Sequence, residues 1–189
     1  MAKSAEKPKI INAEIVAQSR FFKVEALDLC FSNGEQRRYE RMKSSGRGAV
    51  MMVPIHNNES LILVREYAAG THSYELGFPK GLIDEGEQAE VAANRELMEE
   101  AGFGAKQFYP LKSLQLAPAY FANAMSVFIA DDLYPQTLPG DEPEPLEVVY
   151  WPIKDALQLL NEPDFNEARS VCALMLALKW LETDPRKGV

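Results

Sequence analysis

The 23 residues from Gly81 to Phe103 combine acidic side chains, one arginine and several glycines in a fixed spacing. They match the pattern G-x5-E-x7-R-E-U-x-E-E-x-G-U, where U is a bulky aliphatic or aromatic residue. Glutamate carboxylates are hard oxygen ligands, and with water and phosphate they suit Mg²⁺, or alternatively Mn²⁺. The pattern therefore indicates a site for divalent cations and phosphate chemistry.

A helix over residues 88–101 would gather three of these carboxylates on one face. This stretch contains no Pro or Gly and is dominated by good helix formers. At roughly 100° per residue, Glu96, Glu99 and Glu100 fall within about 100° of arc. Because like charges this close destabilise a bare helix, bound divalent cations would offset the repulsion. An acidic helix face exposed to solvent is the alternative explanation of E-x-x-E-E alone.

The remaining positions of the pattern should hold the glutamates in place. Arg95 can pair with Glu87 or Glu85 across the junction of loop and helix, and such bracing matters at metal sites. Gly102 follows the helix as a glycine that ends it. The neighbouring stripe of the helix should pack inward through Ala93, Leu97 and Ala101. These surrounding positions favour a metal site over a solvated acidic face.

The pattern as a whole resembles the Nudix box, the signature of enzymes that hydrolyse nucleoside diphosphates linked to another moiety. The resemblance implies that Glu96 and Glu100 bind metal and that Glu99 binds metal or orients its water. It also implies a ligand from the backbone carbonyl of Lys80 and a brace between Arg95 and Glu87. A further carboxylate is expected from a later loop, where Asp141, Glu142 and Glu144 are candidates. Glu144 is favoured as the ligand and Glu142 as the catalytic base.

The flanks of the box resemble the ADP-ribose pyrophosphatase branch of the family. Leu63-Val64-Arg65-Glu66-Tyr67 and Tyr74-Glu75-Leu76 precede the box, and Pro118 and Tyr120 lie 16 and 18 residues after Gly102. With Phe-Asn-Glu-Ala-Arg at 165–169 and Gly-Asp-Glu-Pro-Glu-Pro at 140–145, this combination looks like bacterial members that hydrolyse several ADP compounds. The resemblance implies cleavage of ADP-ribose, NADH or diadenosine polyphosphates to AMP plus a phosphorylated moiety. A sensor that binds such ligands without hydrolysing them is the alternative.

Several side chains outside the box are candidates for substrate contacts. Arg41, Arg47 and Arg65 could bind phosphates, because arginine matches phosphate oxygens in pairs. For each of them a surface ion pair is an equally good explanation. Rings that could stack on adenine, or alternatively pack in the core, are Tyr67, Tyr74, Phe78 and Tyr120. Pro118 and Tyr120 are expected at the substrate through the resemblance.

Composition limits the partners. The formal net charge of −8 disfavours a nonspecific binder of nucleic acid or of an anionic membrane. No apolar run approaches the length of a membrane span, and Met1–Lys9 lacks an apolar signal region. Cys30 and Cys172 are far apart and are expected to be reduced core thiols. We therefore expect a cytoplasmic protein whose main partner is a small nucleotide substrate.

The order of predicted elements indicates an α/β class. Residues 11–17, 21–31 and 36–42 are predicted strands, with a hairpin turn at Asn33-Gly34. A linker at 44–48 precedes strands at 49–55 and 61–67, the box, and strands at 108–116, 124–130 and 147–151. A loop is predicted over 133–145 and helices over 155–161 and 166–181. This suits an α/β/α Nudix sandwich with a mixed sheet and an N-terminal antiparallel β segment.

Two domains are expected. Residues 1–48 form a β-rich dimerisation segment, and residues 49–189 form the Nudix hydrolase domain. The first segment is apolar and strand-like but too short to be stable alone. We therefore expect a homodimer through residues 11–42, in agreement with what the resemblance implies.

Overall fold

A computed structural model describes residues 6–44 and 46–183, and these fall into two compact units. The predicted domains extend to residues 1–5 and 184–189 and the predicted linker includes Ser45, all of which lie outside the described residues. The first unit ends at Gly46 and also contains Gln115–Asn123, which the prediction had placed in the second domain. A backbone bond of 2.8 Å from the Met42 amide to the Tyr120 carbonyl and a parallel bridge between Met42 and Phe121 attach this segment.

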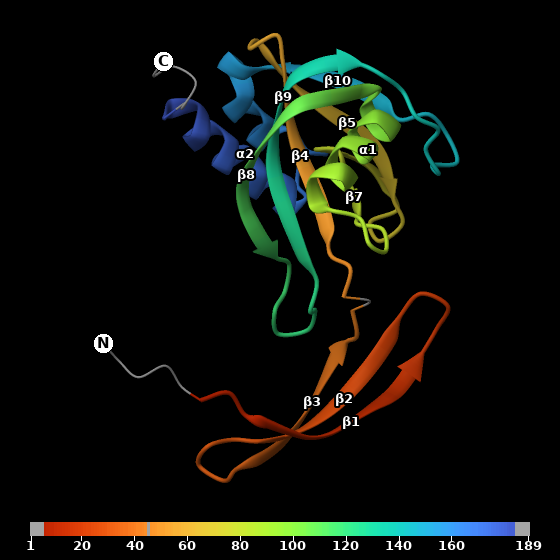
Figure 1. Ribbon diagram of the computed structural model, residues 1–189, viewed down its shortest axis with the longest axis vertical. Coiled ribbons are helices and arrows are strands. Elements are labelled where there is room, and N and C mark those ends of the chain that lie inside the picture. The colour runs from red at the N-terminus through yellow and green to blue at the C-terminus, as the bar shows by residue number, and fades with distance from the viewer. Residues whose placement is uncertain (1–5, 45, 184–189) are drawn as a thin grey trace. The chain divides into compact units, whose positions relative to one another are not determined.

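The first unit is a three-stranded antiparallel sheet in the order β1-β2-β3 (Figure 1). The strands are β1 (Lys9–Gln18), β2 (Lys23–Cys30) and β3 (Gln36–Met42). Gly34 has a φ of +86° in the turn between β2 and β3, a conformation that glycine adopts without steric cost. The predicted hairpin and the N-terminal antiparallel segment are therefore confirmed.

The second unit is built on a seven-stranded mixed sheet. Its main path runs β10-β5-β4-β9-β8, with β6 paired to β5 and β7 paired to β4, and β4 and β9 are parallel. The strands are β4 (Ala49–His56), β5 (Ser60–Ala68), β6 (Ser73–Gly77), β7 (Lys80–Leu82), β8 (Phe103–Gln115), β9 (Ala124–Pro135) and β10 (Glu147–Pro152). The helices are α1 (Ala89–Ala101), the 3₁₀ helix η1 (Ile153–Asn161) and α2 (Ala168–Glu182).

Two hydrophobic cores cover the two faces of this sheet. Successive side chains of a strand point to opposite faces, and the apolar run in β4 divides accordingly. Met51 and Val53 join a core with α2 and η1, whereas Val50 and Met52 join a core with α1. Figure 1 shows α1 and α2 on opposite sides of the sheet. This confirms the predicted α/β/α sandwich.

Some element boundaries were predicted wrongly. Strand β8 begins at Phe103, directly after α1, rather than at residue 108, and β9 continues to Pro135 where a loop was expected. Gly104 of β8 lies so close to the Tyr134 ring of β9 that a Cβ there would collide with it. Lys106 and Asp132 pair across the same strands at 3.2 Å. These cross-strand contacts extend the strands beyond what the local sequence favours.

Two further expectations can be compared with the described residues. Cys30 and Cys172 are free and half-buried rather than fully in the core. Within residues 6–44 and 46–183, no helix combines the length and the apolar character needed to cross a membrane.

Candidate active site

Helix α1 presents its polar face to a cleft because its other face is buried in the core. Its buried residues are Ala92, Ala93, Leu97, Met98 and Ala101. The helix ends as predicted at Gly102, which has a φ of +73° and whose amide bonds to the Leu97 carbonyl. The glutamates between these apolar positions are thereby directed away from the core, as the spacing indicated.

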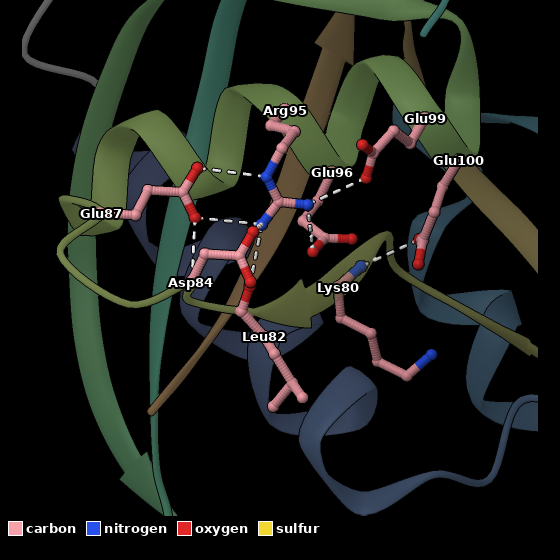
Figure 2. Close-up of polar contacts among 8 residues, drawn as sticks. All are labelled: Lys80, Leu82, Asp84, Glu87, Arg95, Glu96, Glu99 and Glu100. Carbon is pink, nitrogen blue, oxygen red and sulfur yellow. Dashed lines mark hydrogen bonds and ion pairs between the residues drawn. The ribbon is translucent and has the colours of Figure 1, made fainter. Parts of the chain in front are cut away.

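Arg95 is the centre of the polar network on α1 (Figure 2). Its guanidinium donates to both carboxylate oxygens of Glu87, at 3.1 and 3.0 Å, and to the Leu82 carbonyl at 2.9 Å. Nη1 also donates to Glu96 at 2.8 Å and to Glu99 at 2.9 Å. Hydrogen bonds to Glu87 raise the pKa of Arg95, and the guanidinium in turn lowers the pKa of Glu87. Arg95 therefore ties the loop of the box to two of the three clustered glutamates.

Glu96 lies against the backbone of Gly81. A Cβ at residue 81 would overlap the Glu96 carboxylate, so the first glycine of the box leaves the space that this side chain occupies. Burial raises the pKa of Glu96, and the negative charges of Glu99 and Asp141 act in the same direction against Arg95. The carboxylate is therefore held in a place where its charge is only partly compensated.

Glu100 is the most strongly perturbed carboxylate of the site. Burial raises its pKa to about 8, although the Lys80 side chain and amide partly oppose the shift. Its Oε2 accepts a hydrogen bond from the Lys80 backbone amide at 3.0 Å (Figure 2). The Lys80 ammonium itself pairs with Glu66 of β5. A half-buried carboxylate without a cation of its own is poorly solvated and would gain from a bound metal ion.

Glu66 is a site residue that the sequence analysis did not propose. Its charge raises the pKa values of Glu100 and Glu142, and its side chain lines the same cleft. The available signal was its place in β5, where four buried apolar residues are followed by Arg65 and then by Glu66. A charged residue on a strand is a weak signal for a site residue unless the sheet topology shows that the strand lies beside the box.

The cleft beside α1 has a volume of about 600 Å³. Box residues and the later loop line it together, among them Arg47, Glu66, Lys80, Gly81, Arg95, Glu96, Glu99, Glu100, Asp141, Glu142 and Arg169. A contiguous hollow of about 250 Å³ lies between the α1 glutamates and residues 140–146, which include Glu144. The structure thus brings the predicted loop carboxylates next to the box.

The two favoured loop carboxylates have different surroundings. Partial desolvation, with the charges of Glu66 and Asp141, raises the pKa of Glu142 although the residue is exposed. Glu144 instead accepts a hydrogen bond from the Tyr74 hydroxyl and raises the pKa of that tyrosine. Glu142 is therefore free to act in the cleft, whereas Glu144 is engaged by a side chain of β6.

The chemistry of the donor set fits a divalent cation. Among the described residues, no three carboxylate, imidazole or thiol side chains converge closely enough to hold a metal as they stand. Instead, Arg95 donates hydrogen bonds to Glu96 and Glu99, and the Lys80 amide donates one to Glu100. Glu96 and Glu100, the half-buried acids with raised pKa values, supply hard oxygen atoms, which suit Mg²⁺ or Mn²⁺.

The predicted substrate contacts are distributed over both units. Arg65 pairs with Glu147 at 2.8 Å and with Asp164, and it does not line the cleft. Tyr67 is exposed, shares a hydrogen bond of 2.8 Å between its hydroxyl and His72, and lines a smaller cavity beside the cleft. Phe78, considered for stacking, is fully buried in the core. The substrate roles of Arg65 and Tyr67 stay predictions.

Three other predicted contacts belong to the first unit. Arg41 donates two hydrogen bonds, at 3.0 and 2.8 Å, to the buried carboxylate of Glu25. Pro118 and Tyr120 are exposed in the segment that joins this unit. Their substrate roles also stay predictions.

Comparisons with known proteins identify both parts of the chain. The NUDIX domain family matches residues 46–174, and the family described as NudE-type Nudix hydrolase N-terminal domain matches residues 8–41. ADP compounds hydrolase NudE of Escherichia coli (strain K12) is 58% identical over 186 residues, covering 98% of this chain and 100% of that protein. ADP-ribose pyrophosphatase of Bacillus subtilis (strain 168) is 25% identical over 173 residues, covering 88% and 92%.

A solved structure agrees with the fold. A crystal structure of an ADP compounds hydrolase superposes with a TM-score of 0.91 at 57% identity, and the match covers 98% of this chain and 100% of that one. The predicted box, fold and hydrolase class are therefore confirmed. The chain belongs to the Nudix hydrolase family, in the group that carries a NudE-type N-terminal domain.

Proposed function

We propose that this Nudix hydrolase is a Mg²⁺-dependent pyrophosphohydrolase that cleaves the diphosphate of ADP-linked compounds. ADP-ribose, NADH and diadenosine polyphosphates are the substrates proposed, and AMP plus a phosphorylated moiety are the products. The observation that carries the proposal is the pair of half-buried carboxylates, Glu96 and Glu100, braced by Arg95 and Lys80 inside a cleft. The similarity to ADP compounds hydrolase NudE supports the choice of substrate class.

Glu96, Glu100 and the Lys80 carbonyl would hold the cation, with Glu144 as a further ligand. A Mg²⁺ ion held there would supply neutralisation of phosphate charge and a lowered pKa of a water molecule. Water adds to one phosphorus while the bridging P–O bond breaks. Glu142 takes the proton of that water, and its raised pKa favours proton acceptance. Glu99 is the second candidate for this role, and Arg95 keeps it beside Glu96.

The sensor hypothesis is disfavoured by the same residues. Binding an ADP-linked ligand does not require three glutamates clustered on a helix and braced by one arginine. Such a cluster costs stability unless it serves a cation. The intact set of carboxylates therefore supports hydrolysis.

The test is turnover of ADP-ribose, NADH and diadenosine triphosphate with Mg²⁺, compared with ATP and dGTP as kcat/KM. We expect the three ADP-linked compounds to exceed ATP and dGTP. Tight binding of ADP-ribose without turnover would instead support a sensor. Separate Glu142→Gln and Glu99→Gln variants identify the base, because loss of a general base lowers kcat by roughly 10²- to 10⁴-fold with little change in KM.

We also propose that the protein is a cytoplasmic homodimer. Strand β1 is exposed over its whole length and carries the exposed side chains Ile10, Ile11, Ile15 and Val16. Several exposed apolar side chains on one edge strand are typical of an interaction site. The free cysteines support a reducing compartment.

A further inference from the structure

The N-terminus of α2 carries an arginine whose terminal nitrogens are not used within the described residues. Arg169 is half-buried, and its Nε donates to Glu167 at 2.6 Å. The Glu167 carboxylate also accepts hydrogen bonds from the amides of Arg169 and Ser170, at 3.1 and 2.9 Å. Because Glu167 is fixed by the backbone, it fixes Arg169 in turn. The two Nη groups of Arg169 remain available to a ligand.

Arg169 borders both the cleft and a second cavity of about 140 Å³. Glu66 and Lys80 border both as well, but they neutralise each other as an ion pair. Arg95 is occupied by three glutamates and a carbonyl. Among the described residues that line the cleft, Arg169 and the exposed Arg47 are therefore the cations left to meet an anionic substrate.

The second cavity is rich in hydrogen-bond acceptors. It is lined by the carboxylates Glu66, Glu75 and Glu167 among small and apolar residues such as Val64 and Leu76. Glu75 Oε1 accepts from the hydroxyls of Ser73 and Thr71, at 2.6 and 2.8 Å. Glu75 Oε2 is buried and makes no hydrogen bond of acceptable geometry within the described residues, although the Asn166 side chain interacts with this carboxylate and lowers its pKa. A ligand with several hydroxyl donors would satisfy such a lining.

The size of this cavity restricts what enters it. At about 140 Å³ it is much smaller than the cleft of about 600 Å³. The smaller cavity therefore suits a single sugar ring, and the cleft suits the larger part of the substrate. Gly77 at the wall admits the close approach of α2, since a Cβ there would lie 3.0 Å from Ser170 Oγ. The cavity thus depends on the packing of the same helix end that carries Arg169.

We propose that Arg169 binds the phosphate that leaves with the non-adenylate half of the substrate, and that the second cavity receives the sugar on that phosphate. A guanidinium fork can hold two phosphate oxygens at once. Hydroxyls of the sugar donate to the Glu75 carboxylate in the cavity wall. The proposal rests on the proposed function, since it names the part of the cleft that each half of an ADP-linked compound occupies.

The test is equilibrium binding of the two product halves, ribose 5-phosphate and AMP, to the Mg²⁺-loaded full chain by calorimetry. Arg169→Gln should lower the affinity for ribose 5-phosphate by about tenfold to a hundredfold, which is the effect expected when a charged hydrogen bond is lost. AMP binding should change by less than about twofold, which is within the effect of a remote surface charge. Lys154→Gln removes one positive charge at an exposed position of η1 and serves as the control.

Two further variants separate the parts of the proposal. Arg169→Lys keeps the charge and should retain part of the binding, and it substitutes for the Gln variant should that one not fold. Glu75→Gln should weaken ribose 5-phosphate and leave inorganic phosphate unchanged, because Glu75 is assigned to the sugar alone. Each variant is compared with the wild type by circular dichroism.

The proposal is overturned if the wild type binds no ribose 5-phosphate, or if Arg169→Gln weakens AMP as much as ribose 5-phosphate. It is also overturned if Arg169→Gln leaves both ligands unaffected. These measurements involve binding of products and need no turnover. Failure of the wild type to hydrolyse ADP-ribose would therefore count against the proposed function separately.

Discussion

At the scale of single residues, one guanidinium organises most of the site. The spacing of the box predicted that Arg95 would pair with Glu87 or Glu85, the resemblance implied Glu87, and the structure shows the pair with Glu87. The spacing could not show that the same guanidinium would also hold Glu96 and Glu99. Side-chain rotamers determine which carboxylates the guanidinium contacts, whereas sequence periodicity shows only which residues share a face of the helix. Arg95 thus acts both as a brace and as the counter-charge of two glutamates.

Arg95→Lys should retain the positive charge and lose the fork that joins the loop to the helix. A single ammonium cannot reach Glu87, Glu96 and Glu99 in the same geometry. Changes of this kind near metal ligands typically cost 10- to 100-fold in metal affinity or activity, and we expect a loss of about that size. Apparent Mg²⁺ affinity from activity titrations would measure it. Glu85→Gln in the same loop is the control, and equal losses in both variants would contradict the bracing role.

Gly81→Ala should impair activity much more than stability. The added Cβ overlaps the Glu96 carboxylate, which is the flexible end of a side chain and can move aside. Moving it displaces a proposed metal ligand. We expect kcat to fall at least about tenfold, since displacing a ligand by about 1 Å costs up to 10²-fold. Gly70→Ala, where a Cβ meets open space, is the matched control. Unchanged kcat with a lowered melting temperature would contradict the prediction.

At the scale of elements, the sequence predicted which face of a helix is buried better than it predicted where strands and helices begin and end. The inward stripe of α1, which appears in the structure, follows from local periodicity. The extensions of β8 and β9 do not, because their residues are ordered by partners far along the chain, such as Gly104 by Tyr134. The helix predicted at 155–161 is a 3₁₀ helix that starts at Ile153. Tertiary pairing sets these limits, so local propensity could not supply them.

The Glu100 carboxyl of α1 should make the metal-free protein less stable as the pH rises. Glu100 has a pKa of about 8 when folded and an ordinary value of 4.5 when free. Between these values the folded state binds more protons than the unfolded state, so stability is present at low pH and is lost as pH rises toward 8. Burial raises the pKa of Glu96 in the same direction. Melting temperatures of protein treated with a chelator, at pH 5.5 and pH 8, would measure this slope of stability against pH.

Two comparisons make this pH prediction specific. Glu100→Gln should flatten the slope, whereas Glu90→Gln at an exposed position of the same helix should not. Mg²⁺ should raise the melting temperature more at pH 8 than at pH 5.5, because the carboxylate must lose its proton to bind metal. A slope that is the same in both variants would assign the effect to other groups.

At the scale of the whole molecule, the chain folds as two units that the sequence separated only approximately. The break near residue 46 follows the linker signal at 44–48, where glycines and serines gather. Membership of residues 115–123 in the first unit could not be predicted, because it depends on bonds between Met42 and residues about 80 positions later. A stretch rich in glycine and serine shows where the chain can bend. The pairing of a distant loop with the first unit depends on tertiary contacts, which the local sequence does not show.

The first unit should control the oligomeric state through the exposed side chains of β1. Ile11 is 56% exposed and Val16 is 44% exposed, and both sit at register shifts where β1 departs from regular pairing with β2. Lysine at these two positions should therefore disturb the sheet little while placing charge on the apolar surface. We expect the wild type to have twice the chain mass of 21.2 kDa by light scattering, and the double variant to have 21.2 kDa. Leu157→Lys, at a 58% exposed position of η1, should stay dimeric. A wild type of 21.2 kDa at micromolar concentration, or a double variant that remains dimeric, would show that this surface serves another purpose.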